Sequence, residues 1–293
     1  MKGFSIIIPT LHRTAFLLNT LKDLVLQQYE HPFEVIIVDQ SQEKDVEVLN
    51  YIKGFDFITY HHITSFKGLP EARNYGATNA IYEYLLYLDD DIRCEPDLLA
   101  QHAIFLDAND ISMVAGGITE KFKTNSDCEI GKFVSRTATP LRGFHLEGQR
   151  EVDHAGGGNF SVKKSVYTEV GGIDEQLTKG AALYEETDFC LRFKKTGHTI
   201  FYNHKAHMTH LAAETGGCRV SDIRAYIYSL SRNRTIVIYR HLPWHHNITA
   251  NLYLIKLIVS YTIAYKDIGI FKSYYNGLKD GKRVAKQPSL RTQ

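Results

Sequence analysis

Three consecutive carboxylates, Asp89, Asp90 and Asp91, follow an apolar run from Tyr84 to Leu88 that is typical of a buried strand. Adjacent like charges raise one another's pKa values near a core unless a cation or hydrogen-bond donors neutralise them. Hard oxygen ligands suit Mg²⁺ or Mn²⁺, which usually share their coordination with substrate phosphates. The triplet therefore indicates a metal with a nucleotide diphosphate. The competing interpretation is a solvated acidic turn before a helix that starts near Glu95.

A second acidic group, Glu185, Glu186 and Asp188, could supply a general base. Two adjacent carboxylates should raise one pKa toward neutrality, which suits proton abstraction at ordinary pH. The same residues in the first turn of a helix that ends with Lys194 and Lys195 are also ordinary helix-dipole patterning. The residues alone leave both interpretations open.

The histidines His204, His207 and His210 are spaced at intervals of three, which on a helix would line one face and could form a metal site. They follow a strand predicted over 199–203, however. For His204 and His207 we expect ordinary hydrogen bonds, as we do for the pairs at 61–62 and 245–246.

Strands and helices that alternate through about residue 118 must position these groups. The patterns predict strands at 4–8, 33–38, 56–61, 84–88 and 112–118, and helices near 14–28, 43–53, 70–83 and 96–107. Continuous apolar runs at 6–8 and 35–38 are typical of strands covered on both faces. The fold class is α/β with a mostly parallel sheet, and polar residues after the strand ends, Thr10, Asp39 and the acidic triplet, should converge.

Beyond residue 118 the pattern changes twice. Residues 119–152 are expected to be loops and short elements laid over the sheet, followed by a helix near 163–170 and a second over roughly 184–196. Residues 222–240 and 250–280 are predicted to be helices. We therefore expect a domain over 1–220 with two halves, one to about 118 and one over 119–220, and a helical extension over 221–293.

The end of the chain is locally basic, with eight Lys or Arg from Asn251 onward against Asp267 and Asp280. Its longest uncharged run, Leu257 to Tyr265, is shorter than the ~20 apolar residues that cross a bilayer, so no span is expected. Two interpretations stay open: a peripheral membrane helix on an anionic leaflet, and an amphipathic helix packed on the catalytic domain with a solvated basic face.

Composition excludes several classes of protein. The 34 basic and 33 acidic residues nearly cancel, so no global field favours a nucleic-acid partner. The four cysteines, at 94, 128, 190 and 218, include no CxxC pair and are expected to be reduced core thiols. The N-terminus runs directly into a strand with no leader pattern, and we expect a cytoplasmic protein.

Taken together, six segments resemble the family 2 glycosyltransferases, which are inverting enzymes of the GT-A fold. The resemblance covers roughly residues 4–215, and it implies that the half to about 118 is the nucleotide-sugar half and that 119–220 is the acceptor half. Its segments are Ser5-Ile6-Ile7-Ile8-Pro9-Thr10, Val38-Asp39-Gln40-Ser41, Gly68 to Gly76 with Ala72-Arg73-Asn74, Asp89-Asp90-Asp91, Gly156 to Asn159 with Gly171 to Glu175, and Glu185 to Arg192.

The resemblance implies a role for each matching residue. Pro9, Thr10 and Asp39 would contact the nucleotide, with Asp39 on the base, where its alternative is an Asx-turn cap. Arg73 would line the same crevice, oriented by Asn74. Asp91 would hold Mn²⁺ or Mg²⁺, joined by His210, with Asp89 or Asp90 reaching the ribose or a metal-bound water. Gly157, Gly158 and Asn159 would face donor sugar and acceptor. Glu186 would be the base, with Glu185 as substitute; the family more often has Asp there.

What the resemblance implies as a whole is a metal-dependent transfer of a sugar from a UDP- or dTDP-type donor to a hydroxyl of a glycan or lipid-linked glycan. The basic tail favours an acceptor at the inner face of a membrane, in polysaccharide or cell-surface glycan assembly. Two alternatives stay open: a relative that binds nucleotide sugar or a partner without turnover, and a sugar nucleotidyltransferase. The latter normally carries a Gly-rich basic loop where Pro9 to Arg13 stands.

Overall fold

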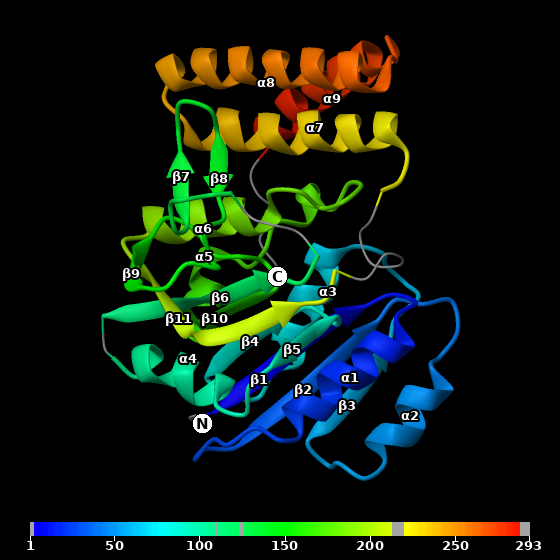
Figure 1. The fold of residues 1–293 in the computed structure, drawn as a ribbon, viewed down its shortest axis with the longest axis vertical. Coiled ribbons are helices and arrows are strands. Elements are labelled where there is room, and N and C mark those ends of the chain that lie inside the picture. The colour runs from blue at the N-terminus through cyan, green and yellow to red at the C-terminus, as the bar shows by residue number, and fades with distance from the viewer. Residues whose placement is uncertain (1–2, 109, 123–125, 213–219, 288–293) are drawn as a thin grey trace.

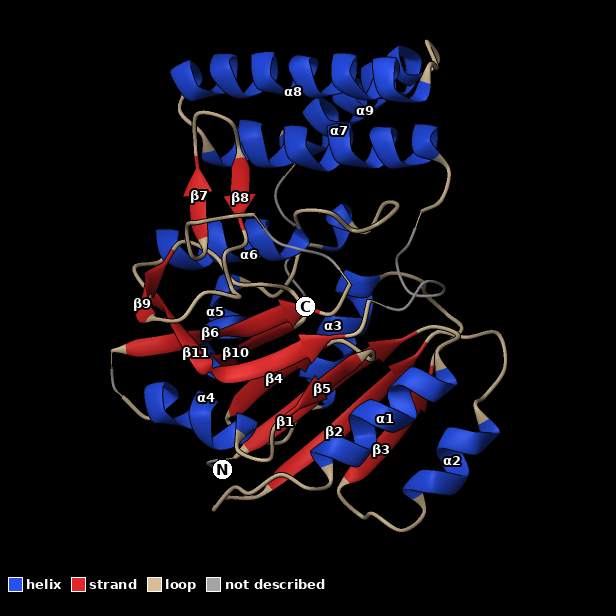
Figure 2. Ribbon diagram, in the orientation of Figure 1, coloured by secondary structure: helices blue, strands red, loops and turns tan. Residues whose placement is uncertain are grey.

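The computed structural model describes residues 3–108, 110–122, 126–212 and 220–287, which form the layered architecture of Figures 1 and 2. The strands of the main sheet are β1 (Phe4–Thr10), β2 (Phe33–Asp39), β3 (Ile58–His62), β4 (Tyr84–Leu88), β5 (Ile92–Cys94), β6 (Ile111–Glu120), β9 (Gln149–Val152), β10 (Asn159–Lys163) and β11 (Thr199–His210). A separate hairpin joins β7 (Lys132–Val134) to β8 (Thr139–Leu141).

The helices of the first two thirds of the chain flank this sheet. They are α1 (Thr14–Leu24), α2 (Val46–Ile52), α3 (Leu69–Asn79), α4 (Leu98–Leu106), α5 (Lys164–Val170) and α6 (Glu185–Lys195), with a short 3₁₀ turn at Glu175–Leu177. The predicted helices near 14–28, 43–53, 70–83 and 96–107 all exist, each a few residues shorter than expected.

The sheet follows the order β3-β2-β1-β4-β10-β6-β11-β5, and β9 pairs with β11. Strands β3, β2, β1 and β4 are parallel neighbours, as are β6 and β11, whereas β10, β5 and β9 pair antiparallel. The predicted mostly parallel α/β sheet is confirmed. The carboxyl ends of β1, β2, β4, β6 and β11 lie toward the same edge, where ligands bind in sheets of this kind.

Side chains that alternate along β1 explain why the sheet is covered on both faces. Phe4, Ile6 and Ile8 enter one core, which α1 and α4 complete, whereas Ile7 enters the opposite core with side chains of α3, α5 and α6. All four β1 residues are fully buried. A continuous apolar run is therefore required here, because both faces of the strand must be apolar.

Several expectations were wrong in detail. Short strands β5, β7, β8, β9 and β10 were not predicted, and β11 continues to His210 rather than ending at 203. Each short strand exists because it pairs with a strand distant in the sequence, and periodicity over three to five residues does not reveal such a partner. Cys128 is exposed and not a core thiol, whereas Cys190 is buried; Cys218 lies outside the described residues.

The last third forms three helices, α7 (Ile223–His241), α8 (Trp244–Tyr265) and α9 (Ile270–Ala285). A Cβ on Gly277 or Gly281 of α9 would lie 2.5 Å from a carbonyl oxygen of α7, so the glycines allow close packing of these two helices. The single helix predicted over 250–280 was wrong: α8 ends with a left-handed residue at Lys266, and α9 starts again at Ile270.

The prediction that this region is too short to span a bilayer also needs correction. The sequence argument counted only the uncharged run after Lys256, but α8 starts at Trp244 and has 22 residues. Its length and mean hydropathy of 1.3 would suffice for a span, and 17% of its apolar window is buried inside the protein. Length and composition alone therefore do not exclude a membrane role for α8.

Candidate active site

The acidic triplet forms the turn between β4 and β5. β4 is buried along its length, so the turn emerges directly from the core, and Asp90 and Asp91 are buried with it. Asp90 accepts hydrogen bonds from Thr10 Oγ1 at 2.7 Å and from Arg13 Nη1 at 2.8 Å. Burial raises the pKa of Asp90 to about 6, although Arg13 and Thr10 oppose the shift. The turn is therefore not the solvated one of the competing interpretation.

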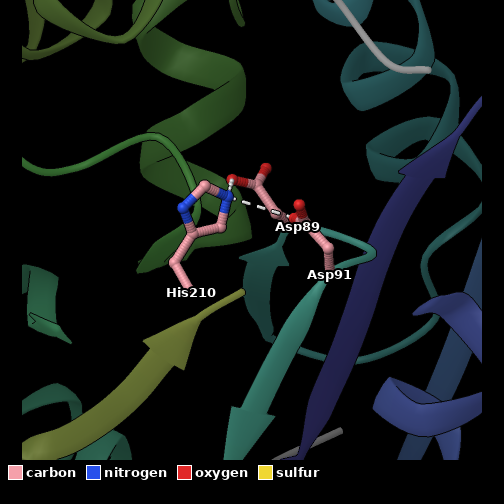
Figure 3. A group of neighbouring side chains, drawn as sticks. All are labelled: Asp89, Asp91 and His210. Atoms are coloured by element: carbon pink, nitrogen blue, oxygen red, sulfur yellow. Dashed lines mark ion pairs between the residues drawn. The ribbon is translucent and has the colours of Figure 1, made fainter. Parts of the chain in front are cut away.

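His210, at the end of β11, completes a cluster with two of these carboxylates. Its Nε2 lies 3.1 Å from Asp91 Oδ1 and 3.9 Å from Asp89 Oδ2, and one ligand atom from each residue lies within 4.8 Å of the others. Figure 3 shows the three side chains pointing toward one another. Two carboxylates and an imidazole are a donor set that suits Mn²⁺, and the oxygens suit Mg²⁺. The residues present fit a divalent metal.

Glu120 holds the imidazole of His210 from its other side. Glu120 ends β6, and the parallel register pairs it with His210; its Oε2 lies 2.8 Å from His210 Nδ1. Burial lowers the pKa of His210, but hydrogen bonds with Asp91 and Glu120 raise it to about 10. A metal that binds Nε2 must displace this proton, while a carboxylate on Nδ1 fixes the ring orientation. Sequence analysis missed Glu120, because only the strand register brings it to a partner 90 residues away.

Arg73, on α3, connects three parts of the site. Its buried guanidinium pairs with Glu185 of α6, donates from Nη2 to the carbonyl of Gly157 at 2.5 Å, and lies 3.6 Å from Asp89 Oδ1. Burial raises the pKa of Glu185 to about 8, more than Arg73 lowers it. Glu185 therefore holds a proton at neutral pH for much of the time.

Asn74 does not orient Arg73 as expected. Its amide donates to the carbonyl of Ile173 and to Glu175 Oε1, both at 2.9 Å, and its oxygen accepts from the Ile173 amide at 3.0 Å. Consecutive helical residues point about 100° apart, so Asn74 faces another segment than Arg73 does. Asn74 fastens residues 173–175 to α3.

The glycine loop before β10 approaches the acidic turn closely. A Cβ on Gly158 would lie 2.3 Å from Asp89 Oδ2, and one on Gly157 would lie 3.3 Å from the Arg73 guanidinium. Asn159 points the other way: its amide donates to the carbonyls of Gly117 and Ala206 at 3.0 and 2.8 Å inside the sheet. Gly157 and Gly158 thus face the site as expected, whereas Asn159 supports the loop from behind.

Glu186 lies behind Arg142. Glu186 is 6% exposed, and its Oε1 accepts a hydrogen bond from Arg142 Nη2 at 2.7 Å. Arg142 follows β8, and more than half of its side chain is exposed. Tyr184, the residue before α6, has a left-handed backbone with a φ of 69° and packs among side chains of α7 and α8. The predicted base is therefore held by a residue that follows the hairpin, within the half of the domain expected to bind the acceptor, and sequence analysis did not single out Arg142 there.

A cavity of about 360 Å³ joins these elements. Its volume is within the range of small-molecule sites. Both the metal-ligand cluster and the candidate base region border it, the latter through Arg142. The lining residues are Asp89, Ile118, Glu120, Ser126, Asp127, Arg142, Phe144, Gly156, Gly157, Gly158, Met208 and His210.

The ends of β1 and β2 converge beside the triplet, as expected. Thr10 is level with Asp39 in the register of β1 and β2, with Pro9 one residue before it, and the Thr10 hydroxyl reaches Asp90. Asp39 is 2% exposed, and it accepts from the Ser41 amide at 2.8 Å and from the Tyr60 hydroxyl. The Asx turn that was the alternative for Asp39 is thus present, alongside lone pairs that could still accept from a base.

The two remaining histidines of β11 make ordinary hydrogen bonds, as expected. His204 Nδ1 lies 2.9 Å from the carbonyl of Gly148, and His207 Nε2 lies 2.9 Å from Thr119 Oγ1. Because all three histidines lie on a strand, the spacing of three does not align them on one face. Of the three, His210 is the one at the metal-ligand cluster.

Comparison with known proteins gives this geometry a context. Residues 5–171 match the model of the glycosyl transferase family 2. A glucosyl-dolichyl phosphate glucuronosyltransferase from Haloferax volcanii is 26% identical over 200 residues, which are 66% of this chain and 63% of that protein. A hyaluronan synthase from Pasteurella multocida is 33% identical over 96 residues, 32% of this chain and 10% of that protein. The chain thus spans less than two thirds of the length of either relative.

Solved structures share the fold at low sequence identity. The structure of S. aureus TarS 1–349 in complex with UDP-GlcNAc has a TM-score of 0.69 and 16% identity, and covers 97% of this chain and 82% of that one. The mannosyltransferase PcManGT from Pyrobaculum calidifontis, in complex with GDP-Man and Mn²⁺, has a TM-score of 0.57 and 13% identity. The match covers 96% of this chain and 86% of that one. The expected GT-A architecture is confirmed.

Proposed function

The chain belongs to glycosyl transferase family 2 and is a glycosyltransferase, and we propose that it moves a sugar from a UDP- or dTDP-type donor to a hydroxyl of a glycan or lipid-linked glycan. We propose a metal-dependent reaction that inverts the anomeric carbon in a single in-line displacement. One observation carries this proposal: Asp89 and His210, which form a cluster with the buried Asp91, line the same cavity as Gly157 and Gly158.

Asp89, Asp91 and His210 would hold Mn²⁺ or Mg²⁺. When bound, such an ion neutralises charge on the departing diphosphate, which is leaving-group catalysis. Around it, Arg13 lies 3.4 Å from Asp91 Oδ2 and Glu120 fixes His210, so these ligands need little reorganisation. The Mn²⁺ in the complex of PcManGT supports this assignment.

Glu186 would accept the proton of the acceptor hydroxyl as its oxygen attacks the anomeric carbon. For that contact Arg142 must release the Glu186 carboxylate or share it with the acceptor, because Arg142 lines the cavity and Glu186 does not. Glu185 is the second candidate. Its bond to Arg73 and its pKa of about 8 make it the weaker base at neutral pH, since the protonated form cannot accept.

A lipid-linked acceptor at the cytoplasmic face of a membrane completes the proposal. The printed name of the Haloferax volcanii relative includes a dolichyl phosphate, which supports an acceptor of that chemical class. We propose a role in polysaccharide or cell-surface glycan assembly, with the catalytic domain in the cytoplasm.

Donor turnover tests the proposal without a known acceptor. The protein is incubated with UDP- and dTDP-sugars and Mn²⁺, the free nucleoside diphosphate is measured, and NMR gives the configuration of the released sugar. Metal-dependent release with inverted configuration supports the proposal. Binding of a nucleotide sugar without release, with any glycan or lipid-linked acceptor offered, would instead favour the alternative of a non-catalytic relative. Formation of pyrophosphate from a nucleoside triphosphate and a sugar phosphate would favour nucleotidyl transfer.

A further inference from the structure

The outer face of α8 carries a continuous apolar stripe that no described residue covers. Figure 1 shows α8 as the outermost element of the molecule, separated from the sheet by α7. Six large apolar side chains, each 40–75% exposed, repeat every three or four residues and so share one face. This α8 stripe consists of Trp244, Ile248, Leu252, Ile255, Val259 and Ile263.

The opposite face of α8 already has its partner. Ala250, Leu254 and Ile258 are fully buried in a core shared with α7 and α9. α8 is therefore apolar on two faces, and only one of them is buried against the rest of the described protein. Exposed contiguous apolar surface of this kind marks an interaction site in soluble proteins.

The charges around the α8 stripe identify what would cover it. Residues 244–286 contain seven Lys or Arg and two acidic residues, Asp267 and Asp280, and α8 itself contains none of the latter. Asp267 pairs with Arg224 through two contacts of 2.7 Å, and Asp280 lies 3.2 Å from Arg283. Lys256 beside the stripe and Lys266 at its end are exposed. The surface is thus apolar and cationic.

We infer that the α8 stripe and its lysines dock on an anionic phospholipid bilayer, with α8 lying in the plane of the interface. Apolar side chains enter the acyl boundary while lysines remain at the headgroups, the arrangement that interfacial helices adopt. A second copy of the chain would bring Lys256 and Lys266 toward like charges, with no carboxylate of α8 to offset them. Insertion of α8 across the bilayer would remove Ala250, Leu254 and Ile258 from the core that they share with α7 and α9. When α8 lies on the bilayer surface, its buried face keeps its contacts with the protein core and the α8 stripe contacts lipid.

Flotation of the full chain with lipid vesicles tests this inference, and it does so without any activity measurement. The vesicles contain either phosphatidylcholine alone or equal amounts of phosphatidylcholine and phosphatidylglycerol. We expect the protein to float with the mixed vesicles, to bind the neutral ones less, and to leave both at high salt. The double variant Leu252→Ser with Ile263→Ser should bind at least ~10-fold more weakly, because two apolar side chains leave the acyl boundary.

Matched control variants test whether binding depends on the α8 stripe specifically or on any exposed apolar side chains. Leu26 and Ile104 lie elsewhere and are 62% and 58% exposed, against 61% and 71% for Leu252 and Ile263. The double variant Leu26→Ser with Ile104→Ser should therefore float like wild type. Lys256→Glu should weaken binding to the mixed vesicles by roughly 30-fold, because the charge changes by two units at ~1 kcal/mol each, and Lys53→Glu should not. Thermal unfolding verifies that each variant is folded.

Three outcomes would overturn the inference. The first is that wild-type protein floats with neither the neutral nor the mixed vesicles at low salt. The second is equal flotation of the stripe variant and the control. The third is a wild-type dimer that becomes a monomer when the stripe is changed, since a second copy would then cover α8. The docking surface lies outside the catalytic cavity, so failure of this inference leaves the proposed transfer unaffected, and the reverse also holds.

Discussion

Arg142 donates a hydrogen bond of 2.7 Å to Glu186, and it is Arg142, not Glu186, that lines the cavity. The pair joins the hairpin that precedes Arg142 to the first turn of α6. In this arrangement the Glu186 carboxylate faces the guanidinium and does not line the cavity where a substrate would bind. For Glu186 to act as a base, Arg142 must therefore release the carboxylate or share it with the acceptor.

Replacement of Glu186 by Gln should lower the rate of transfer by ~10²–10⁴ while nucleotide binding persists, because the amide cannot accept the hydroxyl proton. Steady-state turnover and calorimetric nucleotide affinity measure the two effects separately. The neighbour Glu185→Gln is the matched control. If it loses the rate and Glu186→Gln keeps it, the roles assigned to the two glutamates are reversed.

The buried Glu185 should make stability depend on pH. Its pKa is raised from 4.5 to about 8 by burial, so the folded state binds this proton more tightly than the unfolded state does. Its contribution to the free energy of unfolding is therefore present below pH 4.5 and is lost as pH rises toward about 8. Melting temperatures of wild type and Glu185→Gln at the two ends of this window test the prediction. The melting temperature of wild type, relative to that of Glu185→Gln, should fall as pH rises. A constant difference between the two melting temperatures would mean that Glu185 is ionised throughout.

Glu120→Gln should weaken Mn²⁺ binding by ~10–100-fold, because the amide no longer fixes His210 Nδ1 as a carboxylate does. Titration of Mn²⁺ followed by electron paramagnetic resonance gives the affinity without any substrate. Glu129→Gln is the control, since Glu129 is an exposed partner of Lys132. Equal affinities for the two variants would remove Glu120 from the support of the metal site.

Gly158→Ala should displace the Asp89 carboxylate, because the new Cβ would lie 2.3 Å from Asp89 Oδ2. We expect weaker metal binding and slower turnover from this variant, with a fold that otherwise persists. Gly54→Ala is a control with no neighbouring heavy atom within 4 Å of the new Cβ. Unchanged metal affinity in Gly158→Ala would show that Asp89 is not needed as a ligand in its present position.

Local sequence patterns were sufficient to predict the parallel strands β1, β2 and β4 that lead to the acidic turn. The buried strand before Asp89 and the apolar runs of β1 and β2 depend on their own residues, so periodicity reveals them. The strands β5 and β9 were missed because each is too short to show a period and exists only through pairing with β11. The break in the last predicted helix was also missed: α8 ends at a left-handed lysine, Lys266, and Gly269 precedes α9.

The residues of the candidate site also fall into two groups, those that a sequence motif reveals and those that only the tertiary structure reveals. Asp91, Arg73 and Glu186 stood in motifs that a sequence displays, and the structure brings their neighbourhoods together around one cavity. Glu120 and Arg142 belong to no motif. Their importance comes from partners 90 and 44 residues away, and strand register and loop path, which set those contacts, are tertiary properties.

The measurement that tests the central claim most directly is calorimetric titration of UDP, dTDP and GDP, with and without Mn²⁺, into wild type and Asp91→Ala. The proposed site predicts that one of the uracil or thymine nucleotides binds wild type tightly only when Mn²⁺ is present, and that Asp91→Ala loses this binding. Binding that is the same with and without metal, or that survives in Asp91→Ala, would contradict a metal-dependent donor site at the end of β4.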